Sequence, residues 1–296
     1  MSNIRYRPAT EADLSAALDV FSDTMADLYS RSNLPISPFA REQWEPSYRH
    51  VLRTGIFRVA ETPDGRLAAV CHAIVRGRFW FLSGFWVRPE LQKQKVGGPL
   101  LRQVREEGRA RGAEVFSVWS TFDITAVACY LRHGMLPGFQ LLIFSGEPAP
   151  ASLPEPPAGY VAEPLALSTA LELDHAVRGI AREEDHGFWL EENEPRGLAR
   201  QVIHQGSPIG YYYHHFSTIG PVVWSDPIHA DAVLALAARD AVGRNPQLRM
   251  VVPGINHTAI RFALNAGLRL TVAPHFLTSA PLRGLAHYLP SGPTLF

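Results

Sequence analysis

The two lysines of this 296-residue chain, Lys93 and Lys95, stand just before a pair of glycines, Gly97 and Gly98. This short stretch joins an expected strand to an expected helix. The first turn of a helix leaves backbone N–H groups unpaired at the positive end of the helix dipole, and glycine lets a ligand approach the backbone closely. The turn is therefore a candidate site for a pyrophosphate. The other interpretation is an ordinary strand–helix turn with solvated lysines.

Several other chemistries lack their motifs. The sequence around the turn has neither G-x-G-x-x-G nor G-x-x-x-x-G-K-[ST], and no G-x-S-x-G supports a serine hydrolase. Nine of the twelve histidines lie from His175 onward, but no H-E-x-x-H occurs, so we expect scattered surface and strand histidines and no metal site. Cys71 and Cys129 are too few for a disulfide framework.

Three stretches of the first half resemble the GNAT superfamily of N-acetyltransferases, in the family's order. Residues 4–14, I-R-Y-R-P-A-T-E-A-D-L, are similar to its first strand and helix. Residues 85–101, F-W-V-R-P-E-L-Q-K-Q-K-V-G-G-P-L-L, are similar to its acetyl-CoA-binding motif, in which Gln92 and Gly97 match. Residues 123–135 are similar to its pattern D-x-x-A-x-x-x-Y-x-x-x-G-M.

The resemblance implies that acetyl-CoA is the co-substrate and that Tyr130 protonates the leaving sulfur. A phenol with a pKa of about 10 stays protonated at neutral pH and can do so; a tyrosine packed in the core is the other interpretation. The resemblance also implies a set of residues that bind the co-substrate: Phe85, Trp86, Val87, Gln92, Lys93, Gln94, Lys95, Val96, Gly97, Gly98 and Asp123.

Two features depart from the family. Lys95 stands where the family usually has a glycine, and a backbone φ above zero would cost a lysine about 1–2 kcal/mol. The expected strand 79–87 has no carboxylate, although many family members carry a glutamate base there. Deprotonation of an amine would then involve water, Ser83, His72, His133 or a group from the second half.

The clearest boundary is a proline-rich stretch, where helix and central strand are both disfavoured. We therefore predict a catalytic, acyl-CoA-binding GNAT domain at 1–146, a linker at 147–158, a degenerate GNAT-like domain at 159–280 and a tail over the surface at 281–296. The expected fold class is α/β (α+β), with two GNAT-like domains. Each would be a mixed, mostly antiparallel twisted sheet flanked by helices.

The pattern of each half predicts a similar order of elements. In the first half these are strand 4–7, helices 10–29 and 41–53, strands 55–61, 66–75 and 79–87, helix 96–111, strand 115–120, helix 124–132 and strand 139–144. In the second half they are strand 160–164, helix 167–180, strands 209–216 and 221–224, helix 229–242, strand 248–252, helix 258–264 and strand 268–275.

One motif occurs in both halves. Asp123 and Asn256 are each followed by an alanine after three residues and by a glycine after eleven. We interpret this as an internal duplication of one α/β unit.

The second half is predicted to bind no acyl-CoA. Its counterpart of the turn, residues 224–230, has no glycine or lysine and introduces Asp226, which would repel a pyrophosphate. Ala263 occupies the tyrosine position.

The predicted activity is acetyl-CoA-dependent N-acetylation of a small-molecule amine by direct attack in a ternary complex. The alternative is a non-catalytic GNAT-like protein that binds CoA or acts through its surface. The family implies an acceptor site within residues 29–44, including Asn33, Phe39, Glu42 and Trp44, although these aromatics could equally be ordinary packing residues.

The 28 basic and 28 acidic residues balance, so neither nucleic acid nor a membrane is an expected partner. No apolar run reaches the roughly 18 residues of a membrane span, and the N-terminus lacks a signal peptide, which predicts a cytoplasmic protein. The chain is expected to be a pseudo-dimeric monomer with tandem domains, or a homodimer.

Overall fold

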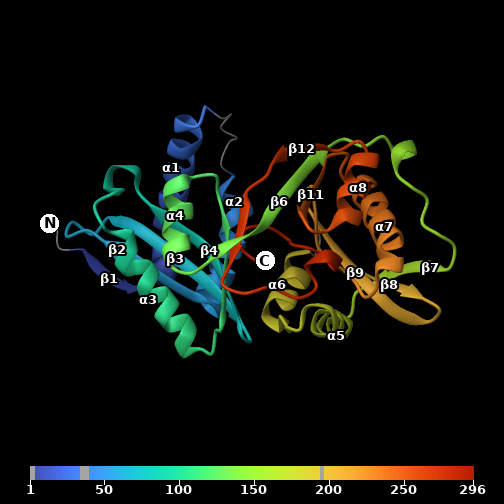
Figure 1. The fold of residues 1–296 in the computed structure, drawn as a ribbon, viewed down its shortest axis with the longest axis horizontal. Coiled ribbons are helices and arrows are strands. Elements are labelled where there is room, and N and C mark those ends of the chain that lie inside the picture. Colours follow the sequence, from blue (N-terminus) through green and yellow to red (C-terminus); the bar gives the residue numbers. More distant parts are fainter. Residues whose placement is uncertain (1–3, 34–39, 194–196) are drawn as a thin grey trace. The chain divides into compact units, whose positions relative to one another are not determined.

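The computed structural model describes residues 4–33, 40–193 and 197–296. These residues form two compact units (Figure 1). The first unit comprises Met1–Val118 with Pro293–Leu295, and the second comprises Trp119–Gly292 with Phe296.

The first unit is a five-stranded sheet with helices on both faces. Its strand order is β1-β2-β3-β4-β5, in which β4 and β5 are parallel and the other pairs are antiparallel. Its elements are β1 (Arg5–Pro8), α1 (Leu14–Arg31), α2 (Arg41–Thr54), β2 (Ile56–Glu61), β3 (Leu67–Arg76), β4 (Phe79–Val87), α3 (Gly97–Ala110) and β5 (Val115–Ser120).

Alternate residues of β4 face different helices, as strand geometry requires. Phe85 approaches the start of α3, at Gly97. The next residue, Trp86, instead contacts Phe21 of α1, with ring centroids 4.9 Å apart. Helix α3 therefore covers one face of the sheet, and α1 and α2 cover the other.

Strands β4 and β5 pair over only part of their length. Phe79–Leu82 is matched with Val115–Val118. Beyond Leu82, the segment Ser83–Val87 pairs with β3 alone among the described residues of the first unit. A β-bulge marks this point, because the register shifts between His72 and Ala73 so that Ser83 is the extra residue on β4. Within the described residues of the first unit, Ser83–Val87 thus has a strand partner on one edge and none on the other.

The second unit is a larger, mostly antiparallel sheet in the order β13-β6-β11-β10-β9-β8-β7. Strand β12 also pairs with β6, and β14 pairs with β10. Its elements are α4 (Ile124–Arg132), β6 (Leu136–Gly146), β7 (Tyr160–Pro164), α5 (Leu167–Arg178), α6 (Glu183–Asn193), β8 (Leu198–His204), β9 (Ser207–His215), β10 (Thr218–Trp224), α7 (Ala230–Val242), β11 (Leu248–Pro253), α8 (His257–Asn265), β12 (Arg269–Val272), β13 (His275–Thr278) and β14 (Tyr288–Leu289).

Three consecutive tyrosines on β9 show how this sheet is covered. Tyr212 donates its hydroxyl hydrogen bond to Asp240 of α7 (2.5 Å). Its neighbours Tyr211 and Tyr213 instead bond to Asp174 of α5 and His186 of α6. Helices α5 and α6 therefore lie on one face, and α7 and α8 lie next to each other on the opposite face (Figure 1).

The predicted duplication appears in the order of elements. Both halves run strand, helix, helix, three strands, helix, strand, helix, strand, from β1 to β6 and again from β7 to β12. The shared motif also has a physical basis. Asp123 and Asn256 are the N-caps of α4 and α8, and Gly134 and Gly267 take the left-handed conformation after these helices.

Several sequence expectations need correction or addition. Helix α6 and strand β8 were not expected, and the strand expected at 268–275 is divided into β12 and β13. The tail expected over the surface is wrong in its last part, because Tyr288, Leu289 and Phe296 are fully buried. The predicted linker 147–158 stays a prediction as a domain boundary. The compact units divide earlier, after Val118, because β6 pairs with strands of the second half.

Candidate functional site

The turn between β4 and α3 has the strained backbone that the sequence suggested. Lys95 has a φ of 63°, and Lys93 has the same value. Both lysines are therefore in the left-handed region that glycine occupies without strain. A turn held in this conformation points successive N–H groups inward, which is the arrangement that binds anions.

The two glycines have different roles. A Cβ on Gly97 would lie 2.7 Å from the Phe85 ring, so this glycine lets α3 pack closely on β4. A Cβ on Gly98 would have no atom within 4 Å. Gly98 therefore has open space beside it at the first turn of α3.

Side-chain hydrogen bonds hold the turn in place. The Gln92 amide donates to the carbonyl oxygen of Val87 (3.1 Å), and Gln94 donates to the carbonyl oxygen of Glu90 (2.8 Å). The Tyr6 hydroxyl donates to the carbonyl oxygen of Val96 (3.0 Å), which links the turn to β1. The backbone N–H of Gln92 also donates to the carbonyl oxygen of Pro89 (3.3 Å), so both its side chain and its N–H hold the turn.

The charge of the turn is positive. Glu90, the acidic residue within it, pairs with Arg66 at 2.8 Å. Lys93 and Lys95 are exposed and form no ion pair with any residue that the structure describes. Their charges therefore remain available to an anion bound at the helix N-terminus.

The strand that leads into this turn carries the residues implied for the pantetheine arm. Phe85, Trp86 and Val87 are half-buried on the unpaired edge of β4. The carbonyl oxygen of Val87 accepts hydrogen bonds from Thr24 (3.2 Å) and Gln92. We call this edge, Ser83–Val87, together with the turn Gln92–Gly98, the first slot.

A buried histidine lies against the bulge of the first slot. His72 pairs with Gly84 across the β3–β4 ladder, and a Cβ on Gly84 would lie 2.3 Å from its Nε2. Within the described part of the chain, neither ring nitrogen of His72 has a hydrogen-bond partner, nor does the Ser83 hydroxyl. Burial lowers the pKa of His72 to about 3, so its imidazole is neutral and a weak base at neutral pH.

Aromatic side chains from α1, α2 and β4 meet beside this edge. Phe21 lies between Trp44 and Trp86, with centroid distances of 4.7 and 4.9 Å. Of the expected acceptor residues, Trp44 and Glu42 are on α2 and Asn33 follows α1, whereas Phe39 lies outside the described residues. Trp44 therefore has a packing role whether or not it also contacts an acceptor.

The remaining predicted residues lie in the second unit, on α4. Tyr130 is buried, with 5% of its surface exposed. Asp123 accepts hydrogen bonds from the backbone N–H groups of Thr125 (2.7 Å) and Ala126 (3.3 Å). This carboxylate caps the helix, which accounts for an aspartate at this position without any ligand.

The corresponding turn of the second unit differs chemically. We call the edge of β10, Val222–Trp224, with the turn Ser225–His229 the second slot. In this turn the Asp226 carboxylate accepts the N–H of Ile228 (3.0 Å). An acidic side chain thus takes up a backbone N–H that would otherwise face a ligand, and its charge repels phosphate.

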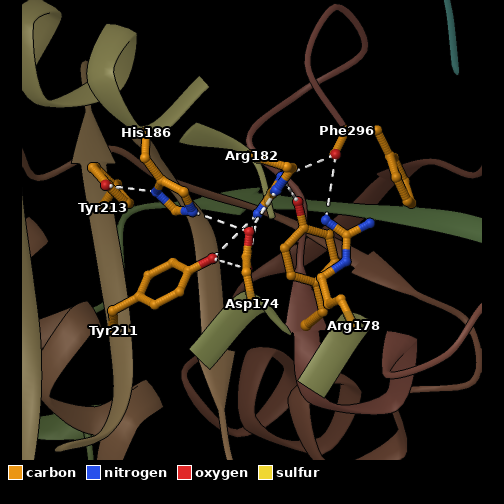
Figure 2. A network of polar contacts seen from close by, with 8 residues as sticks. Asp174, Arg178, Arg182, His186, Tyr211, Tyr213 and Phe296 are labelled. Atoms are coloured by element: carbon orange, nitrogen blue, oxygen red, sulfur yellow. Dashed lines mark hydrogen bonds and ion pairs between the residues drawn. The ribbon is translucent and has the colours of Figure 1, made fainter. Parts of the chain in front are cut away.

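The sequence analysis missed a group of buried polar residues in the second unit. His186 is fully buried, as are Asp174 and Arg182, to which it is linked (Figure 2). The expectation of scattered surface and strand histidines is therefore wrong for His186, which is a helical core residue. The signal that could have found it is the tyrosine run of β9, since each buried hydroxyl needs a partner.

Comparison of the sequence with models of protein families identifies one segment of the chain. Residues 18–135 match the sequence model of the acetyltransferase (GNAT) family. This range contains most of α1, the first slot and α4. This segment therefore matches the GNAT family, and the order of elements that it contains is repeated in the second half of the chain.

Solved structures agree in fold along the whole chain. A proposed acetyltransferase from Pyrococcus horikoshii is similar with a TM-score of 0.79 and 15% identity, over 100% of this chain and 97% of the other. A tandem GNAT protein from the clavulanic acid biosynthesis pathway has a TM-score of 0.64 and 13% identity, over 94% and 99%. A GCN5-related N-acetyltransferase from Sphaerobacter thermophilus is similar with a TM-score of 0.65 and 16% identity, over 93% of this chain and 95% of the other. No curated protein matches the sequence.

Among the described residues, no helix is both long and apolar enough to cross a membrane. No cluster of three histidine, cysteine or acidic side chains suited to a metal ion occurs among them. The cytoplasmic location and the lack of a metal stay predictions.

Proposed function

We propose that this protein is an acetyl-CoA-dependent N-acetyltransferase that acts on the amine of a small molecule by direct attack in a ternary complex. The observation that carries the proposal is the first slot. An unpaired strand edge leads into a positively charged turn, and Gly98 leaves open space at the N-terminus of α3. This combination suits a ligand with an extended polar arm and a pyrophosphate.

Acetyl-CoA would supply the acyl thioester, and the chain would position it. Backbone groups of Phe85, Trp86 and Val87 would hold the pantetheine arm, and Gln92–Gly98 would surround the pyrophosphate. A backbone N–H at the bulge near Ser83 would donate to the thioester carbonyl as negative charge develops there. Tyr130, assigned from its place in the family motif, would donate a proton to the departing sulfur.

The acceptor amine would enter in its neutral form. Strand β4 carries no carboxylate, and His72 is too weak a base to hold a proton at neutral pH. The amine nitrogen would therefore attack the carbonyl carbon, the carbon–sulfur bond would break, and the amine proton would pass to water. The rate should then follow the fraction of unprotonated amine, rising with pH up to the pKa of the acceptor itself.

A non-catalytic CoA-binding or interaction protein is the second candidate. The lack of a carboxylate on β4 favours it, because acetyl transfer to a strongly basic amine would then have no side-chain base on that strand.

Calorimetric titration with acetyl-CoA tests the proposal first. We expect one site per chain with micromolar affinity, followed by acetylation in a panel of amines of different basicity. Binding without turnover on any amine would favour the non-catalytic candidate. No binding would refute the first slot as a cofactor site.

A further inference from the structure

The second slot has a strand edge like that of the first, but the edge is filled. Among the described residues, the parallel pairing of strand β10 with β11 is confined to Thr218 and Ile219. After the register shift that follows, Val222 and Val223 pair with Leu289 and Tyr288 of β14. The other edge of β10 is already paired with β9 at these positions. Strand β14 therefore lies on the edge that corresponds to the open edge of β4.

The fit of this segment is close. Tyr288 and Leu289 have no exposed surface. A Cβ on Gly220 of β10 would lie 2.3 Å from the carbonyl oxygen of Pro290, so only a glycine lets the segment pass. Before β14, a Cβ on Gly284 would lie 2.4 Å from the carbonyl oxygen of Val177, at the end of α5. The segment is thus packed on both sides against the second unit.

A buried polar network holds β14 from the side of α5 and α6. Arg182 donates to the Tyr288 hydroxyl (2.9 Å) and to the main-chain oxygen of Phe296 (3.0 Å). Its guanidinium is paired with Asp174 at 2.7 Å, and both side chains are fully buried. The guanidinium of Arg178 stacks 3.9 Å from the centre of the Tyr288 ring. Figure 2 shows Arg178 and Arg182 converging on Phe296.

The network keeps its charges inside the core. Burial alone would raise the pKa of Asp174, but Arg182 and His186 together outweigh burial and hold that pKa below its usual range. Burial likewise acts to lower the pKa of Arg182, and Asp174 together with Tyr288 and Tyr211 reverses this. The carboxylate also accepts from Tyr211 (2.6 Å) and contacts His186 (3.0 Å). Asp174 therefore orients the arginine that binds β14.

We propose that Tyr288 and Leu289 occupy the second slot in place of a pantetheine arm, and that the Asp174–Arg182–Tyr288 network locks them there. We call Tyr288–Leu289 the strap, because this segment of the chain closes the second slot. This inference concerns the second unit alone and stands whether or not the first unit is an active enzyme.

A disulfide tests the placement of the strap. Val222 and Leu289 are directly opposed, and opposed residues of an antiparallel pair have the Cα separation that a disulfide needs. The double variant Val222→Cys/Leu289→Cys should oxidise readily, leaving only the thiols of Cys71 and Cys129 in the denatured protein. In the matched control, Val223→Cys/Leu289→Cys, the two side chains point to opposite faces and should stay reduced. Failure of the first pair to oxidise would overturn the proposal.

Titration of the oxidised protein with acetyl-CoA tests the closed slot. Locking β14 to β10 should leave both the affinity and the single binding site unchanged relative to the reduced protein. Loss of binding on oxidation, restored by a reductant, would show that the second slot is the acyl-CoA site and would overturn the proposal. If neither form binds acetyl-CoA, the function proposed for the first unit fails, while the disulfide result still decides where β14 lies.

Hydrogen exchange tests whether the Asp174–Arg182–Tyr288 network stabilises β14. Tyr288→Phe removes the hydroxyl that Arg182 binds and should accelerate exchange of the β14 amides about tenfold, the effect of losing one charge-assisted hydrogen bond. Tyr213→Phe removes a hydroxyl bonded to His186 but not to β14, so exchange in β14 should not change. Equal rates in the wild type and Tyr288→Phe would overturn the role of the network.

Discussion

The first and second slots are built on the same order of elements but differ in what lies along the strand edge. Among the described residues of the first unit, the edge of β4 beyond Leu82 has no second strand partner, and its turn presents Lys93, Lys95 and free space at Gly98. The edge of β10 is paired with β14, and its turn is capped by Asp226. The first repeat therefore has a positively charged turn, whereas the second has a covered strand edge and an acidic cap.

The comparison separates what the fold requires from what a ligand requires. The N-caps Asp123 and Asn256 and the left-handed glycines Gly134 and Gly267 are present in both repeats, because both need helices of the same length at the same place. Lysines and Tyr130 occur in one repeat only. Features confined to one repeat are therefore the better candidates for function.

The largest expected effect is at Tyr130, whose counterpart is Ala263. Tyr130→Phe should lower kcat by about 100-fold or more, the usual contribution of a general acid, and leave the Kd for acetyl-CoA nearly unchanged. Steady-state kinetics and calorimetry measure the two effects. The matched control is Tyr6→Phe, which removes the bond to the Val96 carbonyl and should weaken binding a few-fold without the loss of kcat. An unchanged rate in Tyr130→Phe would remove this tyrosine from the mechanism.

Introducing an acid into the first slot should make it behave like the second. In Gly98→Glu the carboxylate lies where a phosphate would bind, so acetyl-CoA affinity should fall about 100-fold, equivalent to one or two charge-assisted hydrogen bonds. The fold should be unaffected, because a Cβ there meets no other atom. Ile228→Glu adds the same charge to the second slot at a residue that is 75% exposed, and should leave affinity unchanged. If Ile228→Glu weakened binding equally, the contrast between the slots would be lost.

Stability should fall in mild acid because of buried histidines in both units. Burial lowers the pKa of His72 to about 3 and that of His214 to about 4. Below a pH of about 6.5 the unfolded chain therefore binds more protons than the folded chain, and stability decreases as the pH falls. For His72 the loss between pH 7 and pH 5 should be about 2 kcal/mol.

Urea unfolding at the two pH values measures this loss. In His72→Gln, whose side chain cannot titrate, the loss of unfolding free energy between pH 7 and pH 5 should be about 2 kcal/mol smaller than in the wild type. In His214→Gln the loss should be reduced through the second unit instead. A decrease of the same size in the wild type and both variants would assign the acid sensitivity to other groups.

The smallest effect concerns the strained turn. Lys95→Gly relieves a left-handed backbone and should raise the free energy of unfolding by about 0.5–1 kcal/mol, after the greater entropy of unfolded glycine is deducted. It should also weaken acetyl-CoA binding about threefold through the lost charge. Gln205→Gly, at a φ of 50° in the β8–β9 turn, should give a similar stabilisation with no change in binding. An affinity change in both variants would point to a general effect of flexibility.

The sequence predicted most elements and the composition of the first slot because these depend on neighbouring residues. A glycine pair at a helix start, a left-handed position at Lys95 and the motif that begins at Asp123 are all local patterns, although the helix-capping role of Asp123 is seen only in the structure. The structure adds that Gly97 serves helix packing and that Gln92 holds the turn through its side chain.

The pairing of β14 and the network around Asp174 could not be predicted in the same way. Arg182 and Tyr288 are linked although 106 residues separate them, and neither stands in a recognisable motif. The proline- and glycine-rich composition around β14 favoured an exposed tail. Burial there comes from a complementary edge on β10, which is visible only once the sheet is assembled.

The sequence repeat and the compact unit have different boundaries because of β6. This strand closes the first repeat, yet all its partners, β11, β12 and β13, belong to the second. A fragment cut at the proline-rich segment would expose three unsatisfied stretches of strand edge and would tend to associate with another copy. In the full chain the second repeat supplies these partners within the same molecule, so β6 is paired without a second copy.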